Sequence, residues 1–365
     1  MTQQMTRDES LFWDNVDALH IKLEDSGQNQ TESRIYRNGM HQVGVIITAE
    51  VSADGTPLTE SNTPGLTEQL YRHLYLINDS GHADLPRQEL PPGTDACTGD
   101  VWCYTANRNA FATGGLARAN PGDPRISCVF YVMCPERESR QAISLLAKID
   151  MPDGSIDTSG GENTDNAAYE SIRISSLPKK RYTDNNTTLT SYVAAHHPLN
   201  NPPRITALAR NYLFGCDDEG FEFVKFALKT GFGGGEYFRI FDADAAYNNG
   251  GIVYYRNFRI AYTWDAGAEA NQRVFGLRPG PNDPPDWWPL DDINQDRQKQ
   301  YFTVVEFQTE LPGFGYPGTP VNDMQTPNQP SVYFTAWDQY GNGADFHPAT
   351  TTLLDEPFKV LPGRS

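Results

Sequence analysis

Residues 34–51 read Arg34-Ile-Tyr-Arg-Asn-Gly-Met-His-Gln-Val-Gly-Val-Ile-Ile-Thr-Ala-Glu-Val51. Apolar side chains occupy every second position from Val43 to Val51, which is the period of a strand with one buried face. Asn38-Gly39 lies between this run and a shorter extended run, and that dipeptide is typical of a hairpin turn. The stretch therefore predicts paired β-strands, with His41 just after the turn and at the surface.

The first half continues in the same style. Ile126 to Met133 has no polar alternation, which predicts a central strand buried on both faces. Ile143 to Ile149 precedes the turn former Asp153-Gly154, and Asp54-Gly55 marks another turn. Ile172 and Ile174 alternate with polar residues and predict a strand with one solvated side.

The opening segment of the chain is the exception to the strand pattern. Leu11, Phe12, Val16 and Leu19 fall near one helical face, with acidic residues in the first turn. We therefore expect a short N-terminal helix over residues 8–19.

The second half repeats the strand pattern after a break. Residues 185–203 are rich in turn formers and poor in core residues, which predicts a junction there. Further strands are expected at Phe221 to Val224, Ile252 to Trp264, Tyr301 to Phe307 and Val332 to Trp337, with a turn at Asn342-Gly343. Tight turns without alternating helices predict a mainly β fold of two tandem antiparallel β-sandwich domains, immunoglobulin-like or jelly-roll-like, over residues 1–184 and 204–365.

Charge and composition restrict the partners. The 365 residues include 47 Asp and Glu against 29 Lys and Arg, a net charge of −18. This field repels phosphate backbones and anionic lipids, so nucleic acid and membrane are not expected partners. No apolar run approaches the roughly 18 residues of a membrane helix, and residues 1–10 lack a signal-peptide pattern. We expect synthesis in the cytoplasm, with release only by a signal-independent route.

Five cysteines are an odd number in a long chain, which argues against a secreted disulfide framework. Cys97 and Cys103 are six positions apart, and so are Cys128 and Cys134, a spacing that matches no zinc site. Buried free thiols are the expected state, and a bridge between the two pairs, such as Cys103 to Cys128, is the alternative.

Glycine and acidic clusters give weak candidate sites. Gly231-Phe-Gly-Gly-Gly-Glu236 lacks the Lys-Ser/Thr of a phosphate-binding loop, so a hairpin or bulge is expected there. Asp242, Asp244 and Asn248 would place oxygen ligands for calcium in one turn, but the segment departs from an EF-hand loop. No cofactor is expected. Calcium is a candidate ion at this turn, and Asp291, Asp292 and Asp296 form a second acidic cluster with the same weakness.

No local pattern identifies a catalytic group. Neighbouring His196 and His197 point to opposite sides of an extended chain, so one metal ion would seldom use both. The chain has no Gly-x-Ser-x-Gly elbow, no His-Glu-x-x-His and no dinucleotide fingerprint. These observations favour a protein that is not an enzyme.

The aromatic pair Trp287-Trp288 lies in a proline-rich and acidic stretch, residues 278–296, that is expected to be an irregular loop. Flat aromatic side chains in such a loop suit a protein interface, a sugar-binding platform or packing within the domain. The leading hypothesis is a non-enzymatic structural or interaction protein that forms homo-oligomers or binds a protein partner. A carbohydrate-binding or carbohydrate-acting protein is the alternative, and a secreted effector or toxin is a further one.

Overall fold

The computed structural model describes residues 10–24, 31–91, 94–113, 124–159, 169–199 and 205–229. It also describes 241–244, 247–249, 252–255, 257–264, 273–275, 287–289, 301–309, 314–316, 333–350 and 358–362. The expected mainly β fold with several antiparallel sheets is confirmed. The chain forms two compact units: Met1–Lys180 with Tyr340–Asn342, and Arg181–Gln339 with Gly343–Ser365.

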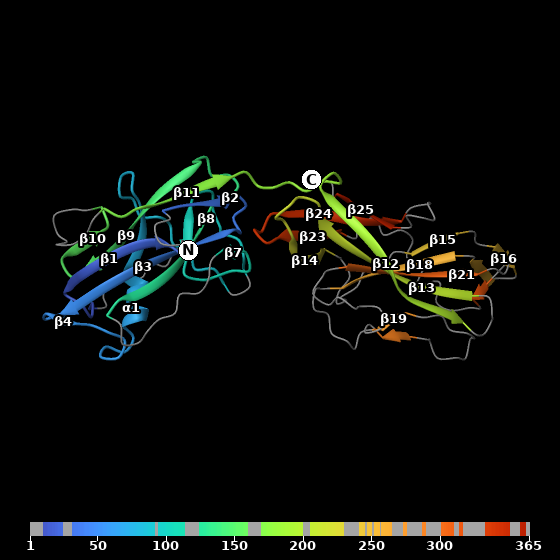
Figure 1. The fold of residues 1–365 in the computed structure, drawn as a ribbon, viewed down its shortest axis with the longest axis horizontal. Coiled ribbons are helices and arrows are strands. Elements are labelled where there is room, and N and C mark those ends of the chain that lie inside the picture. The colour runs from blue at the N-terminus through green and yellow to red at the C-terminus, as the bar shows by residue number, and fades with distance from the viewer. Residues whose placement is uncertain are drawn as a thin grey trace. The chain divides into compact units, whose positions relative to one another are not determined.

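The first unit contains two sheets (Figure 1). One has the order β1 (Asn15–Leu23), β3 (Gln42–Ala53), β8 (Ile126–Met133) and β6 (Cys103–Thr105), with β4 (Thr56–Pro57) and β7 (Ala112–Thr113) also paired to β3. The other has the order β10 (Gly154–Asp157), β9 (Ala142–Met151), β11 (Ile172–Leu177) and β2 (Glu32–Tyr36), with β5 (Leu74–Asn78) paired to β9.

The two sheets share one hydrophobic core. Alternating residues of β3 such as Val45 and Ile47 pack in the same cluster as Leu145 of β9 and Ile174 of β11. β8 is buried along almost its whole length between β3 and β6, as its unbroken apolar sequence predicts. The expected turns at Asp54-Gly55 and Asp153-Gly154 join β3 to β4 and β9 to β10.

The expected hairpin at Asn38-Gly39 is wrong. β2 pairs in parallel with β11 in one sheet, while β3 lies in the other, so the dipeptide connects two sheets. Gly39 has the positive φ, 73°, that such a turn prefers. Local turn chemistry was therefore interpreted correctly, but it does not determine which strands pair.

The expected N-terminal helix is also wrong, because β1 begins at Asn15. A register shift between Val16 and Ala18 inserts one extra residue into the strand. The buried residues Val16 and Leu19 are consequently three positions apart, which imitates helical spacing. The one helix among the described residues, α1 (Leu66–His73), follows Gly65, and the Glu60 carboxylate accepts from the backbone N–H groups of Gly65 and Thr67 at its start.

Gly44 of β3 lies beneath the side chain of Glu24, which is only 2% exposed. A Cβ at position 44 would stand 2.8 Å from Cβ of Glu24 and overlap its carboxylate. Gly44→Ala should therefore lower the free energy of unfolding by about 2 kcal/mol, measured by chemical denaturation. Gly154→Ala is the control, because a Cβ at Gly154 meets nothing within 4 Å. Equal stability of the two variants would contradict the prediction.

The described residues of the second unit form two larger sheets and two small ones. The first larger sheet has the order β12 (Thr187–Leu199), β13 (Ile205–Cys216), β21 (Tyr301–Thr309), β18 (Asn257–Trp264) and β15 (Phe241–Asp244). The second has the order β14 (Phe223–Lys229), β23 (Tyr333–Asp338), β24 (Gly343–Thr350) and β25 (Phe358–Pro362). One small sheet has the order β16 (Tyr247–Asn249), β17 (Ile252–Tyr255) and β22 (Phe314–Tyr316). The other pairs β19 (Arg273–Phe275) with β20 (Trp287–Pro289). Phe214 of β13 packs against Phe223, Phe334 and Phe346 of the second larger sheet.

Three expectations for this half are corrected. Residues 187–199 of the expected junction form the 13-residue strand β12, and the division between units falls after Lys180. The run Ile252 to Trp264 is divided into β17 and β18, which belong to different sheets. In the turn between β23 and β24, the residue with positive φ is Gly341, at 75°. Composition alone thus misjudged where strands begin and end.

Candidate functional site

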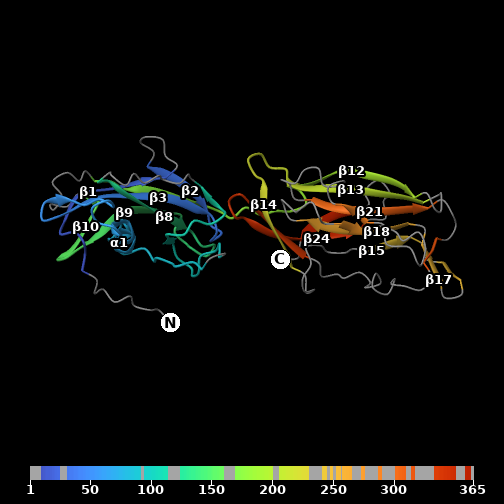
Figure 2. The same cartoon turned by 90° about the horizontal axis from the view of Figure 1, so that it is seen from below.

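β12 is an edge strand of the second unit (Figure 2). It pairs along its whole length with β13, from Thr187 opposite Cys216 to Leu199 opposite Ile205. Within the described residues, its other edge pairs with no strand. Thr190 and Ser191 are both exposed although they are consecutive, so the strand is open to solvent at this point. An edge of this kind presents backbone N–H and C=O groups to a further strand.

The sequence of β12 differs from that of the other edge strands. Proteins usually protect edge strands with charged side chains, proline or short length. In the four larger sheets, the edge strands that contain Asp, Glu, Lys or Arg are β1, β2, β10, β14, β15 and β25. β6, with three residues, and β5, with five, contain none but are short. β12 has 13 residues and none of these four types. Pro198 and a register shift between Val193 and Ala195 protect its C-terminal end. Residues 187–193 are therefore the least protected long stretch of edge in the described part of the chain.

Sequence reasoning missed β12 because of the asparagines and prolines around it. Its own 13 residues contain neither glycine nor a charged side chain and include Thr, Tyr and Val, which favour strands. That uninterrupted uncharged run was the available signal. The edge position of β12 follows from the sheet order, in which β12 pairs with β13 and β13 pairs with β21. No local sequence pattern indicates this order.

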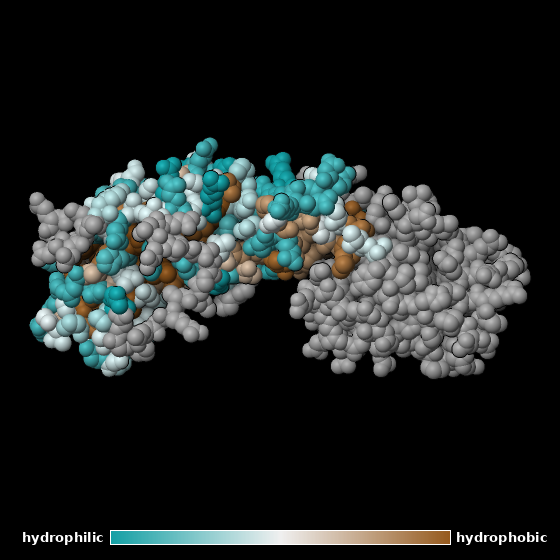
Figure 3. Space-filling model, viewed as in Figure 1, coloured by the Kyte–Doolittle hydropathy of each residue, from teal (hydrophilic) through white to brown (hydrophobic). Residues whose placement is uncertain are grey.

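Exposed apolar side chains do not offer an alternative docking surface in the described residues. The large ones are Phe12, Val101, Tyr169 and Val224, from separate segments. Figure 3 shows hydrophilic and hydrophobic residues interspersed over the described part of the viewed face. Isolated exposed apolar residues are normal in soluble domains, so main-chain recognition at an edge has more support than apolar docking.

The turn that follows β2 holds together residues distant in the sequence. The Asn38 side chain donates to the backbone oxygen of Tyr340 at 2.8 Å and to Oδ1 of Asn342 at 3.0 Å. Its own Oδ1 accepts from the backbone N–H groups of Met40 and His41. All these residues belong to the first unit, so Asn38 is a structural residue of its fold.

His41 is 2% exposed, which corrects the expected surface position. The rings of Tyr36 and Tyr340 lie 5.8 and 5.1 Å from its own ring centre. Nδ1 accepts from the backbone N–H of Tyr36 at 3.0 Å, so the proton of the neutral ring is on Nε2. Burial lowers the pKa of His41 to about 4. The residue is therefore neutral and inaccessible, and it does not suit acid–base catalysis at neutral pH.

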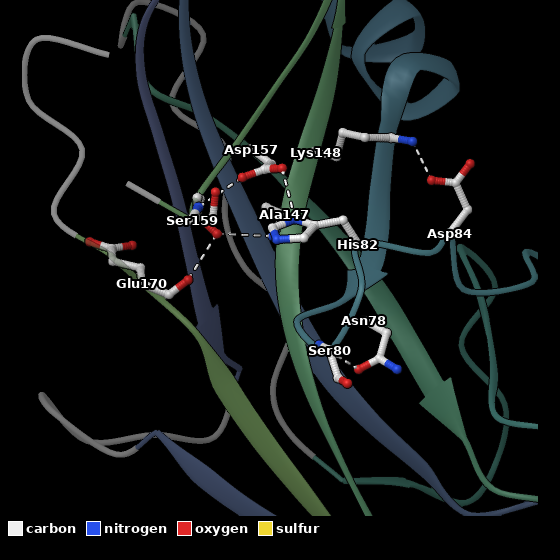
Figure 4. A network of polar contacts seen from close by, with 10 residues as sticks. Asn78, Ser80, His82, Asp84, Ala147, Lys148, Asp157, Ser159 and Glu170 are labelled. Carbon is white, nitrogen blue, oxygen red and sulfur yellow. Dashed lines mark hydrogen bonds and ion pairs between the residues drawn. The ribbon is translucent and has the colours of Figure 1, made fainter. Parts of the chain in front are cut away.

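A polar network lies over one sheet of the first unit (Figure 4). His82 Nδ1 is 3.2 Å from the Asp157 carboxylate, whose other oxygen accepts from the backbone N–H of Ser159. The Thr158 hydroxyl bridges the strands by accepting from Ala147 N–H and donating to the Glu170 backbone oxygen. These bonds join β9, β10 and the segment before β11, so the network has a structural explanation.

A second histidine–carboxylate pair lies near the N-terminal strand. His73 Nδ1 is 3.1 Å from an Asp150 oxygen that also accepts from the Tyr75 hydroxyl. The Trp13 indole donates to the backbone oxygen of Asp150 and meets the His73 ring edge-on. The pair thus anchors the segment that leads into β1, and its bonding partners do not include a nucleophilic Ser or Cys.

The sequence-predicted calcium ligands fall on two strands. Asp242 and Asp244 belong to β15, which pairs with β18, whereas Asn248 belongs to β16, which pairs with β17. The backbone at 242–244 is extended and not a turn. Their side chains lie outside the described part, so calcium binding stays a prediction with less backbone support. The glycine cluster at 231–236 also lies outside the described residues.

Trp287 and Trp288 lie on β20, which pairs with β19, so this part of the expected irregular loop is a strand. Their side chains are outside the described part, and their role as an interface or ligand platform stays a prediction. His196 and His197 are neighbours on β12, opposite Leu208 and Ala207.

The five cysteines are free thiols. Cys103 of β6 lies opposite Met133 of β8. Cys128 is on β8 itself, five residues before Met133, and lies opposite Ile47 of β3. Five residues of strand span roughly 16 Å, so the alternative Cys103–Cys128 bridge is wrong. Cys103 instead lies beside Cys97.

A shallow pocket of about 480 Å³ lies at one end of β1 and β3. Asn15 in its lining donates to Asp17 and Ser52 of the same lining, so these polar groups already bond to one another. No helix in the described residues has the length and apolar content to cross a membrane.

No protein-family model matches the chain, and no curated protein matches it. Among solved structures, it is similar to a protein of unknown function from Bacteroides ovatus, at 8% identity and TM-score 0.18 over 80% of this chain and 97% of that one. It is also similar to the collagen binding domain of the Erysipelothrix rhusiopathiae surface protein RspB, at 10% identity and TM-score 0.16 over 95% and 94%. These similarities are too low to carry a functional argument.

Proposed function

We propose that this chain is a non-enzymatic interaction protein built from two β-sandwich units, which self-associates through the edge of β12. The supporting observation is the length of this edge strand together with its lack of Asp, Glu, Lys and Arg. A strand of that kind adds readily to a further strand, because the new main-chain hydrogen bonds form without burying a charge.

The sandwich interpretation rests on shared cores. In the first unit, residues of both sheets belong to one cluster. In the second unit, Phe214 of one larger sheet packs on Phe223 and Phe346 of the other. Two sheets that bury facing apolar residues in this way are the elements of a sandwich.

The occupant that fits the edge best is β12 of a second copy. An uncharged strand is matched by another uncharged strand, and the other long edge strands of this chain contain charged residues. Antiparallel pairing of β12 with itself across a two-fold axis joins identical surfaces and closes the assembly at a dimer. It also places the exposed residues of the two copies of β12 next to one another.

Ser191→Lys tests this assembly. The substitution would add one ammonium group to each of the two paired strands, which opposes pairing. The solution mass by light scattering should fall from about twice 40.7 kDa for the unaltered chain to 40.7 kDa for the variant. A roughly tenfold weaker association would correspond to about 1.4 kcal/mol.

Asn185→Lys is the matched control. Asn185 is exposed in the turn just before β12, and its substitution makes the same change in net charge. The control should keep the dimer mass. A monomeric unaltered chain, or a Ser191→Lys variant that stays dimeric, would overturn the proposal. Dissociation of the control as well would show that charge alone, and not the edge, governs the mass.

A further inference from the structure

Two thiols of the first unit lie together at the start of β6. Cys103 begins this strand and is fully buried, while Cys97 precedes it in a loop and is half-buried. Both pack with Leu90 and Met133 in one small cluster, separate from the main core of the unit. The two thiols are thus close enough to influence each other's ionisation.

The two thiols are not equivalent. Interaction with the Cys103 thiol lowers the pKa of Cys97, against the effect of burial. The same interaction, together with burial, raises the pKa of Cys103. The thiol that reaches solvent is thus the one that ionises more readily, and the thiolate is the reactive form of cysteine.

Cys134 is close to this pair but has a different partner. Its Sγ donates to the Pro135 backbone oxygen at 3.8 Å, and the side chain is fully buried. Burial raises its pKa to about 12. Cys128 lies further along β8. The arrangement therefore singles out Cys103 as the thiol that faces Cys97.

We infer that Cys97 and Cys103 form an oxidisable dithiol site that takes a hydroperoxide as its oxidant. The Cys97 thiolate attacks the terminal peroxide oxygen, the O–O bond breaks, and the sulfenic acid of Cys97 forms with release of an alkoxide, or hydroxide, that takes a proton. Cys103 then attacks the Cys97 sulfur, the S–O bond breaks, and the proton of Cys103 leaves with the hydroxide as water. Two thiols are oxidised to one disulfide, and the hydroperoxide is reduced to an alcohol, or water, plus water.

The disulfide would act on the turn at Asn38-Gly39. Cys97 N–H donates to the Gly39 backbone oxygen at 2.8 Å, and Gly39 N–H donates to the Cys134 backbone oxygen at 2.9 Å. A Cβ at Gly39 would lie 3.3 Å from the Cys97 sulfur. Oxidation therefore links the loop that holds this turn covalently to β6.

Tryptic digestion of the full chain separates the outcomes. Residues 88–108 form one tryptic peptide that contains both Cys97 and Cys103, and residues 126–137 form another that contains Cys128 and Cys134. The reduced protein is treated with hydrogen peroxide, its remaining thiols are alkylated in denaturant, and the peptides are weighed. We expect peptide 88–108 to carry no alkyl group and to weigh two hydrogens less than its dithiol form, while peptide 126–137 stays doubly alkylated.

Variants assign the roles of the two thiols. Cys103→Ser should leave a sulfenic acid on Cys97 that dimedone traps, whereas Cys97→Ser should leave Cys103 fully alkylated. Cys216→Ser, in the second unit, is the control and should not change peptide 88–108. Full alkylation of Cys97 and Cys103 in the unaltered chain after peroxide, or a cross-link between the two peptides, would overturn the inference.

Discussion

Replacing Asn38 by alanine is expected to lower the free energy of unfolding of the first unit by about 3 kcal/mol. The side chain makes four hydrogen bonds: two accepted from the backbone N–H groups of Met40 and His41, and two donated to Tyr340 and Asn342. Each contributes about 0.5–1.5 kcal/mol, and their loss also leaves half-buried backbone groups without partners.

Hydrogen exchange measures this effect in the unit concerned, because backbone amides of β3 and β8 report opening of the first unit alone. Asn38→Asp is the informative companion, since aspartate keeps the two accepted bonds but has no amide to donate. Its second carboxylate oxygen would face the acceptor oxygens of Tyr340 and Asn342, so we expect it to be at least as unstable as Asn38→Ala. Unchanged protection of β3 and β8 in Asn38→Ala would contradict the structural role of this side chain.

Much of the first unit follows from sequence pattern. Strict alternation located β3, an unbroken apolar run located β8, and Asp-Gly dipeptides located two tight turns. Pairing did not follow, because Asn38-Gly39 prescribes a turn but not whether the next strand enters the same sheet. The bulge in β1 shows the other limit, since one inserted residue changes a two-residue period into apparent helical spacing.

For the candidate sites, too, the sequence indicated single elements but not the contacts between them. That Cys97 and Cys103 are close in sequence was visible, but their packing in one cluster depends on how the loop before β6 folds onto Met133. The burial of His41 could not be predicted, because the ring that covers it belongs to Tyr340, about 300 positions away along the sequence. Local patterns describe single elements, whereas sites here depend on contacts between distant ones.

His41 should make the first unit sensitive to mild acid. In the unfolded chain its pKa is near 6.5, but burial lowers it to about 4 in the folded protein. Between these values the unfolded chain binds a proton that the folded protein does not. Stability is therefore greatest above pH 6.5 and falls as the pH is lowered towards 4, by about 3 kcal/mol from this residue alone.

His41→Gln removes the titrating group while its amide oxygen can still accept from the Tyr36 N–H. Denaturation of both proteins between pH 7 and pH 4 should show that the wild type loses about 3 kcal/mol more stability than the variant. His82→Gln, at an exposed histidine of the same unit, should follow the wild type. Glu138 does not affect the comparison, because all three proteins contain it. Burial opposes its ionisation, but Arg140 and backbone N–H groups hold its pKa at about 2. Parallel curves for the wild type and His41→Gln would mean that the imidazole accepts a proton without opening the turn, and that Tyr340 does not seal it from water.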